Sequence, residues 1–171
     1  MENVVTIENK KNEKFLREKT KPVDSKVIGK RELYAIVAKM RYVMKDAKGV
    51  GLAANQIGLP YRMFIARVGE KSYTVLNPKL IARSKDEETE EEGCLSVPKK
   101  WGQVSRSKEV VLEGEALTGK KIKIEAWGFL ARVFQHEVDH LDGKLFIDKA
   151  TMVADVPTSK RLKTKNRNLE S

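Results

Sequence analysis

Both histidines of this 171-residue chain lie in one short stretch, QHEVDHLDG, at residues 135–143. On a helix, residues four apart share a face, so His136 and His140 can offer ring nitrogens to a single ion. Apolar residues at helical spacing precede them, and Gly143 follows as a residue that ends helices. The stretch therefore predicts a largely buried helix over residues 129–141 that carries a site.

The order His-Glu-x-x-His is typical of helices that hold a catalytic metal ion. Glu137 comes one residue round from His136, where a carboxylate can accept a proton from water that the ion has acidified. Neutral imidazoles suit Zn²⁺, Fe²⁺ or Ni²⁺. The alternative is a pair of surface histidines spaced by chance. Because the chain uses its only two histidines here, we favour the metal site.

A third ligand must come from another residue type. Downstream, the carboxylates of Asp142 and Asp148 are available, and far upstream stands Cys94, the single cysteine of the chain. A thiolate and two imidazoles would leave a fourth coordination position open for water, as in catalytic zinc sites. The alternative for Cys94 is a small buried hydrophobic residue. The glycine before it and its acidic flank favour a loop or strand edge.

Composition limits the class of protein. With 40% hydrophobic and 34% charged residues the chain is globular, and no apolar run approaches the ~20 residues that span a bilayer. The net charge of +10 predicts attraction to polyanions such as RNA or anionic lipid. The N-terminus shows no signal pattern, and a single cysteine fits a reducing compartment. We expect a cytoplasmic protein without a membrane partner, with a catalytic domain at residues 1–150 and a polar basic tail at residues 151–171.

The remaining periodicities predict an α+β fold. Helical spacing over residues 31–48 predicts an amphipathic helix that stops at Gly49, and period-two patterns predict hairpins over residues 61–78 and 109–126. The acidic run SKDEETEEEG is typical of a solvated loop, and KLFI of a short last strand. Residues 1–30 show no clear period apart from a turn at Pro22.

The segment KGVGLAANQIG, at residues 48–58, is rich in glycine and alanine. Gly49 and Gly51 allow close approach of another backbone, and the alanines that follow keep bulk away. A dinucleotide-binding fingerprint would require a further glycine and a preceding strand, and both are missing. The simpler interpretation is the end of a helix followed by a tight turn. Gln56 adds a neutral amide that can donate hydrogen bonds.

Three segments in this order, GVGLAANQ, EGCLS and QHEVDH, resemble the three motifs of the peptide deformylase family, and the flanking FLREKTKPV and LNPKL do so as well. The resemblance runs from the N-terminus to Ile147. It implies antiparallel sheets packed around a central helix that carries both histidines. It also implies a hydrolase that removes the N-formyl group from the initiator methionine of nascent polypeptides, with Fe²⁺ as native metal and Zn²⁺, Ni²⁺ or Co²⁺ as other occupants.

The resemblance implies roles for individual residues. Cys94, His136 and His140 would bind the metal, and Glu137 would move the proton. The Gln56 side-chain amide and the Leu95 backbone N–H would stabilise the charge on the formyl oxygen. The implied substrate-binding residues are Gly49, Val50, Gly51, Gly93, Trp101, Phe129, Arg132 and Val133.

Within that substrate set, backbone groups at Val50 and Gly93 would pair with the extended peptide. Val50, Phe129, Val133 and the aliphatic stem of Arg132 would line a pocket for the methionine side chain. Phe129 and Val133 are equally typical of ordinary core.

The same resemblance suggests that Glu92 pairs with Arg106 and braces the segment carrying Cys94. Asp139 would point away from both histidines and have a structural role. Trp101 would contact later residues of the peptide or cover the end of a strand.

Two other functions fit parts of the pattern. A general metalloprotease would use the same helix, and a non-catalytic RNA- or ribosome-binding domain would hold a structural zinc. An intact Glu137 and an open coordination position argue against the second, because structural zinc sites are normally closed by four protein ligands. The expected partners are N-formylmethionyl nascent peptides and the ribosome, contacted through the basic surface or tail, with no sequence-specific nucleic acid.

Overall fold

The computed structural model describes residues 4–155, without the side chains of Ser25 and Lys26. Its strands form a five-stranded sheet of order β1-β2-β3-β6-β7 and a three-stranded sheet of order β4-β5-β8. All neighbouring strands run antiparallel. The elements are α1 (Lys10–Leu16), α2 (Ser25–Ile28), α3 (Lys30–Asp46), β1 (Gly51–Ala53), the 3-10 helix η1 (Ala54–Ile57), β2 (Met63–Val68), β3 (Lys71–Arg83), β4 (Glu87–Cys94), β5 (Val97–Ser107), β6 (Glu109–Glu115), β7 (Lys121–Trp127), α4 (Gly128–Leu141), the 3-10 helix η2 (Phe146–Asp148) and β8 (Met152–Asp155).

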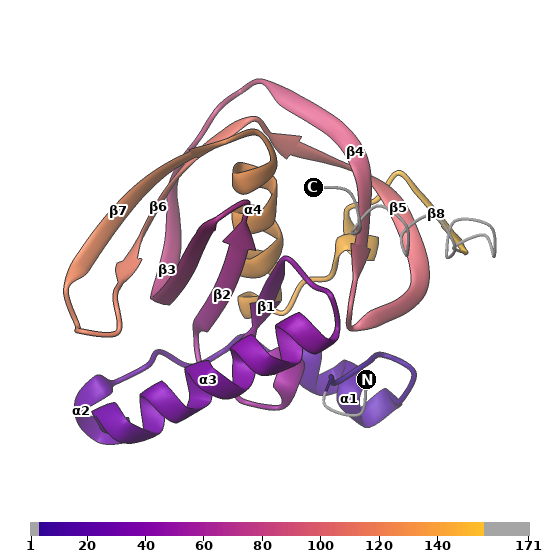
Figure 1. Ribbon diagram of the computed structural model, residues 1–171. Helices are drawn as coiled ribbons and strands as arrows, with labels where there is room; N and C mark the ends of the chain where they lie inside the picture. The colour runs from indigo at the N-terminus through magenta and orange to yellow at the C-terminus, as the bar shows by residue number, and fades with distance from the viewer. Residues whose placement is uncertain (1–3, 156–171) are drawn as a thin grey trace.

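Helix α4 lies between the two sheets (Figure 1) and contacts strands of both. Its apolar face packs on the five-stranded sheet, where the rings of Phe134 and Phe64 lie 5.6 Å apart. The helix begins one residue before the predicted start and ends at Leu141. Gly143 has φ 72°, and a Cβ there would lie 2.6 Å from the carbonyl carbon of Arg17, so only glycine fits at this turn.

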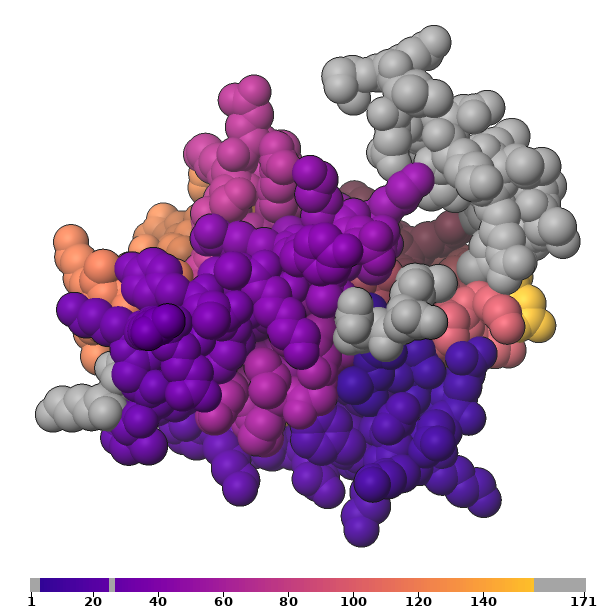
Figure 2. Space-filling view, turned by 60° about the horizontal axis from the view of Figure 1, so that its bottom comes forward, coloured from indigo at the N-terminus to yellow at the C-terminus, as the bar shows by residue number. Residues whose placement is uncertain are grey.

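Helix α3 packs on the other face of the five-stranded sheet at its β1–β2 end, and the chain up to the end of α3 covers much of the face in Figure 2 (Figures 1 and 2). Leu33, Val37 and Met40 are buried against β1 and β2, as the helical spacing predicts. The left-handed residue after the helix is Lys48, with φ 54°, and not Gly49. Glycine at position 49 instead avoids a close contact, because a Cβ there would lie 3.0 Å from Cδ1 of Leu95.

Both predicted hairpins are confirmed as β2–β3 and β6–β7. The predicted acidic loop is wrong, because this run is strand β4, paired with β5 from Glu87 opposite Ser107 to Gly93 opposite Trp101. Hydrogen bonds to β5 hold one side of its backbone, and nearly all its acidic side chains are exposed to solvent. Only Glu92 among them is buried. Charged side chains on such an edge strand also discourage pairing with other chains.

The C-terminal part differs from two expectations. KLFI is not a strand: Leu145 and Phe146 are buried, and the 3-10 turn η2 is closed by Asp148, which accepts a hydrogen bond from the Leu145 amide at 2.8 Å. Strand β8 pairs with β5, so residues 152–155 lie in a sheet and not in a tail. The rest of the expected tail, residues 156–171, lies outside the described residues.

The N-terminal helix α1 was not predicted, since its apolar residues show no clear period. The side chain of Asn9 caps it by accepting a hydrogen bond from the Lys11 amide at 2.8 Å. Among residues 4–155, no helix combines the length and apolar character needed to cross a membrane.

Candidate active site

The three predicted metal ligands converge between the sheets. The Cys94 Sγ atom lies 3.1 Å from Nε2 of His140, and that nitrogen lies 3.2 Å from Nε2 of His136. All three donor atoms lie within 4.8 Å of one another. Cys94 comes from the end of β4 and the histidines from successive turns of α4, so the packing of the helix against the second sheet creates the cluster.

The surroundings of the cluster favour a thiolate and a correctly turned imidazole. Burial raises the pKa of the Cys94 thiol, but the charge of His140 and hydrogen bonds from both histidines outweigh it, so the pKa lies well below its usual value. Nδ1 of His136 lies 3.0 Å from Oε2 of Glu92. Because a carboxylate only accepts, Nδ1 carries a hydrogen, which leaves Nε2 as the nitrogen whose lone pair a bound cation would use.

Glu137 lies beside the donors with its carboxylate buried. Its Oε2 atom has no hydrogen-bond partner among residues 4–155. Burial raises the pKa of this carboxyl to about 7, against the lowering effect of the charges of His136 and His140. Gly51 faces it closely, since a Cβ at that position would lie 2.8 Å from Cδ of Glu137. The absence of a side chain at Gly51 therefore makes the room for the carboxylate.

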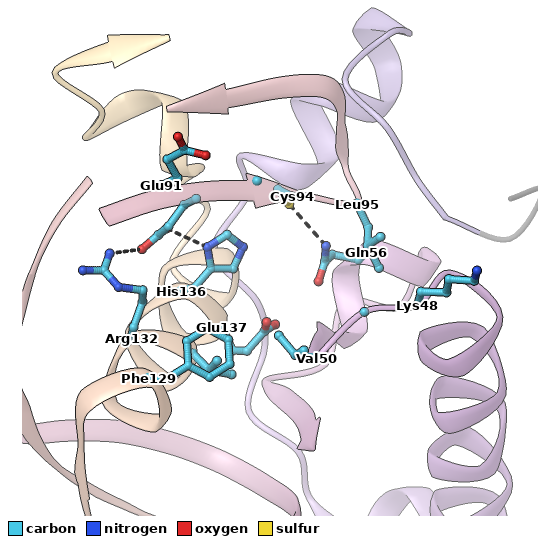
Figure 3. A pocket seen from close by; sticks show the side chains of 15 residues that line it. Lys48, Val50, Gln56, Glu91, Cys94, Leu95, Phe129, Arg132, His136 and Glu137 are labelled. Atoms are coloured by element: carbon cyan, nitrogen blue, oxygen red, sulfur yellow. Dashed lines mark hydrogen bonds and ion pairs between the residues drawn. The ribbon is translucent and has the colours of Figure 1, made fainter. Parts of the chain in front are cut away.

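Gln56 lies on the side of Cys94 away from His136 (Figure 3). Its Oε1 atom accepts a hydrogen bond from the Ala53 backbone amide at 2.9 Å, and this contact fixes the orientation of the Gln56 side-chain amide. Its Nε2 atom therefore faces Cys94 Sγ at 3.6 Å and the Ser96 hydroxyl at 3.2 Å. A neutral donor is thus held beside the cluster of Cys94 and the two histidines.

A cavity of about 400 Å³ opens beside these groups. It lies where β1, an edge strand of the larger sheet, faces β4, an edge strand of the smaller one. The predicted residues that line it are Gly49, Val50, Gly51, Gln56, Gly93, Cys94, Leu95, Phe129, Arg132, Val133, His136 and Glu137. Two lining residues that the sequence did not single out are Lys48 and Glu91, which lie outside the three motifs.

Comparison with known proteins identifies the family. The polypeptide deformylase family model matches residues 1–155. A peptide deformylase from Elusimicrobium minutum is 39% identical over 169 residues, covering 93% of this chain and 95% of the relative. One from Desulforudis audaxviator is 44% identical over 140 residues, covering 81% of this chain and 89% of the relative. The chain belongs to the polypeptide deformylase family.

Solved structures show that the fold is the deformylase fold. Peptide deformylase from Thermotoga maritima matches with a TM-score of 0.79 and 34% identity, over 87% of this chain and 97% of that one. The actinonin-bound class I type b peptide deformylase from Acinetobacter baumannii matches with a TM-score of 0.80 and 32% identity, over 87% and 97%. The predicted α+β fold with antiparallel sheets is therefore confirmed.

The structure places two of the expected substrate-binding residues in more detail than the sequence did. Trp101 lies opposite Gly93 in the β4–β5 ladder and does not line the cavity. Arg132 does line it, but its guanidinium is buried in ion pairs with Glu92 at 2.8 Å and Glu90 at 2.9 Å. The charged end of Arg132 therefore fastens α4 to β4, which the expectation of an aliphatic stem had left out.

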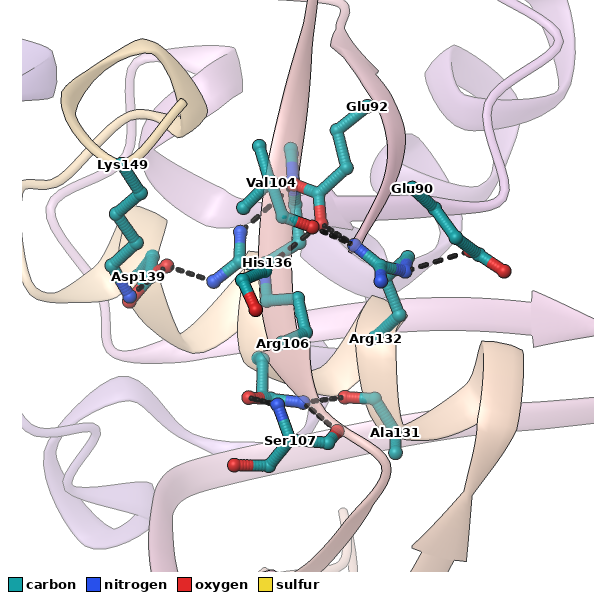
Figure 4. Close-up of polar contacts among 12 residues, drawn as sticks. Glu90, Glu92, Val104, Arg106, Ser107, Ala131, Arg132, His136, Asp139 and Lys149 are labelled. Atoms are coloured by element: carbon teal, nitrogen blue, oxygen red, sulfur yellow. Dashed lines mark hydrogen bonds and ion pairs between the residues drawn. The ribbon is translucent and has the colours of Figure 1, made fainter. Parts of the chain in front are cut away.

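The expected pair of Glu92 and Arg106 is present and belongs to a larger network (Figure 4). Nε and Nη2 of Arg106 each donate to one oxygen of Glu92 at 2.8 Å. Burial raises the pKa of the Glu92 carboxyl, but hydrogen bonds from Arg106 and His136 outweigh it and hold the pKa far below its usual range. Arg106 also pairs with Asp139, which is not one of the three clustered donor residues. The direct contact of Glu92 with His136 had no signal in the sequence.

Proposed function

We propose that this polypeptide deformylase hydrolyses the N-formyl group of N-formylmethionyl nascent polypeptides through the cluster of Cys94, His136 and His140, with Glu137 carrying the proton. The observation that supports this most strongly is the arrangement of the cavity. A soft donor set and the Glu137 carboxyl, whose Oε2 has no partner among residues 4–155, face the same space between two strand edges. That arrangement suits hydrolysis of a small amide at the end of an extended peptide.

The donor set fits a divalent cation. It consists of one thiolate and two imidazoles within 4.8 Å of one another, and Glu92 orients one ring. Three protein ligands leave a position for water, as is usual in catalytic sites. Thiolate and imidazole accept Fe²⁺, Zn²⁺, Ni²⁺ and Co²⁺. We propose Fe²⁺ as the native ion, in line with the family resemblance.

The protein groups around that site divide the chemistry between them. A divalent cation bound there acidifies water and polarises a carbonyl. Glu137 accepts the proton that water loses as its oxygen attacks the formyl carbon, and returns it to the amine nitrogen as the C–N bond breaks. The products are formate and a free amino terminus. The raised pKa of Glu137, about 7, suits a carboxyl that both takes and gives a proton near neutrality.

Gln56 and Leu95 would stabilise charge that develops on the formyl oxygen. The Gln56 amide is already turned with Nε2 toward Cys94, and Leu95 lines the cavity immediately after that residue. Donors held in place before the reaction need no reorganisation. Loss of one such donor typically lowers turnover by about 10²- to 10³-fold, which is our expectation for Gln56→Ala.

The peptide substrate would extend between the edges of β1 and β4. Main-chain pairing along Gly49 to Gly51 and at Gly93 would hold it with little dependence on side chains. Val50, Phe129 and Val133 would contact the methionine side chain. Val50 and Phe129 are exposed at 46% and 52%, which favours a binding surface over ordinary core for them. Trp101 lies outside the cavity lining, so its contact would be with later residues of the peptide.

Finer features of the function are also proposals. Residues 1–150 would form the catalytic domain, extended by β8, and the protein would act in the cytoplasm. Contact with the ribosome through the basic surface or the tail at residues 151–171 is supported by the net charge of +10. Such phosphate contacts would carry no sequence preference.

Formate release from a formyl-Met tripeptide tests the proposal. The enzyme would be purified without oxygen, its metal content measured, and its activity compared with that of Glu137→Gln. We expect metal in both proteins and formate only from the wild type. The acetylated and the free-amino tripeptides serve as controls, since a general metalloprotease would cut internal amides in all three. Equal formate release by wild type and variant would refute the role of Glu137.

A further inference from the structure

Lys149, which directly follows η2, reaches into the molecule toward α4. Its Nζ lies 2.8 Å from Oδ1 and 2.7 Å from Oδ2 of Asp139. Asp139 is buried within the helix turn that carries the metal ligands, next to His140. A buried carboxylate is costly unless it is paired. The contact is therefore more than a surface ion pair.

From Asp139 a chain of ion pairs leads to a metal ligand (Figure 4). Arg106 pairs with Asp139 through Nη1 and with Glu92 through Nε and Nη2. Glu92 in turn lies 3.0 Å from Nδ1 of His136. The chain thus starts from Lys149, crosses α4, β5 and β4, and ends on the ring that faces Cys94.

The way Arg106 divides its donors between Asp139 and Glu92 links Lys149 to His136. Arg106 has a planar fork of donors, and three of its nitrogens are shared between Asp139 and Glu92. Lys149 contacts both oxygens of Asp139 and shares Oδ2 with Arg106. Without Lys149, Asp139 would lose one of its two cationic partners and attract Arg106 more strongly. The fork would then shift toward Asp139 and weaken its two bonds to Glu92.

The alternative role for Lys149 is to anchor the C-terminal segment. That segment is held in other ways, by pairing of β8 with β5 and by the ion pair of Arg17 with Asp148 at 3.0 Å. Phe146 is also buried. An anchor at Lys149 would be redundant.

We propose that Lys149 is a positioning residue for the metal site, acting through Asp139, Arg106 and Glu92 on the orientation of His136. The proposal rests on the proposed function only in that the cluster of Cys94, His136 and His140 holds a cation. Removing an orienting partner of a ligand typically weakens metal binding by about 10- to 100-fold. Because Lys149 acts through intermediate residues, we expect about 10-fold, the lower end of that range.

The test uses Lys149→Met, which keeps the length of the side chain and removes its charge. Lys149→Arg restores the cation. Lys100→Met is the matched control, because Lys100 pairs with Asp155 at 2.8 Å across β5 and β8 but is half exposed. Cobalt binding would be measured by competition with a chromophoric chelator, together with the sulfur-to-cobalt and ligand-field absorption bands.

We expect Lys149→Met to bind Co²⁺ about 10-fold more weakly and to show shifted bands. Lys149→Arg and Lys100→Met should match the wild type. In steady-state assays kcat should fall for Lys149→Met while KM for the formyl peptide stays unchanged. If Lys149→Met does not fold, Lys149→Gln replaces it, with a smaller loss expected because its amide still donates to Asp139.

Wild-type cobalt affinity and bands in Lys149→Met would overturn the proposal, even if its melting temperature fell, because Lys149 would then only stabilise the fold. The same holds if Lys100→Met lost as much affinity. Failure of the proposed function looks different: a wild-type protein that binds Co²⁺ normally but releases no formate would refute the deformylase chemistry and leave the comparison of variants intact.

Discussion

Helix α4 has two buried faces that are held by different physics. One face packs Phe134, Val138 and Leu141 on the five-stranded sheet by apolar contact. The other places Arg132 and Asp139 in ion pairs with residues of β4, β5 and the segment after η2. Apolar contacts depend on volume and tolerate changes of shape. Buried ion pairs depend on every partner being present, because removing one leaves a charge without compensation.

The difference suits the function of each face. The apolar face supplies the hydrophobic stabilisation that holds the helix on the sheet. On the polar side, Arg132 and Arg106 hold Glu92, which contacts Nδ1 of the His136 ring. A site that depends on orientation needs directional contacts, and hydrogen-bonded ion pairs provide them. The following predictions compare the two faces, from the largest expected effect to the smallest.

Arg106→Met should have the largest effect on stability. Arg106 is 3% exposed and neutralises Glu92 and Asp139, so its loss leaves two buried carboxylates without their main partner. We expect a loss of about 3–5 kcal/mol in the free energy of unfolding, measured by urea denaturation. Arg106→Lys keeps the charge but lacks the planar set of donors, so it should recover only part of the lost stability. A loss below 1 kcal/mol would show that the polar face is as tolerant as the apolar one.

Gly51→Ala tests how closely the protein controls the carboxylate that lies between the two faces. The added Cβ would lie 2.8 Å from Cδ of Glu137, so the carboxyl must move. A displacement of about 1 Å costs about 10²-fold in kcat, or about 2.7 kcal/mol, and melting temperature should change little. Gly119→Ala is the control for added bulk at a glycine, because no atom lies within 4 Å of a Cβ there, although its φ of 83° adds local strain. Unchanged kcat in Gly51→Ala would contradict the close fit.

Phe134→Leu should have a moderate effect, confined to stability. Phe134 is fully buried and contacts the rings of Phe64 and Tyr73. Replacing it by a smaller apolar residue should cost about 1–2 kcal/mol by thermal or urea unfolding. Metal affinity and kcat should stay at wild-type values. A large loss of metal affinity would show that the apolar face also orients the ligands.

Lys121→Gln should have the smallest effect and serves as a reference for exposed ion pairs. Lys121 pairs with Glu115 at 2.7 Å on the β6–β7 hairpin, and its side chain is 82% exposed. Exposed pairs of this kind contribute about 0.2–1 kcal/mol, which a double-mutant cycle with Glu115→Gln would measure. If this coupling energy reached the loss of stability expected for Arg106→Met, burial would not explain the sensitivity of the polar face.

Sequence patterns predicted those elements that bury one regular stripe. The helices around residues 31–48 and 129–141 and both hairpins follow from apolar periodicity, and the structure has them. Strand β4 was not predicted because its run of acidic residues shows no alternation of apolar and polar residues. It is held by backbone pairing with β5, a contact that its own residues do not reveal. The turn at residues 146–148 was read as a strand because a short apolar run does not show whether it is extended or coiled.

The spacing of His136, Glu137 and His140 by itself determined that a helix presents two imidazoles and a carboxylate, because helical geometry is local. Three motifs in order also determined the family. Only the tertiary structure decided that Cys94 meets those rings, that Gly51 leaves room for the carboxylate, and that Arg106, Asp139 and Lys149 stand behind His136. These contacts join residues far apart in the chain through the packing of two sheets. Spacing along the sequence does not show which distant residues come together in space.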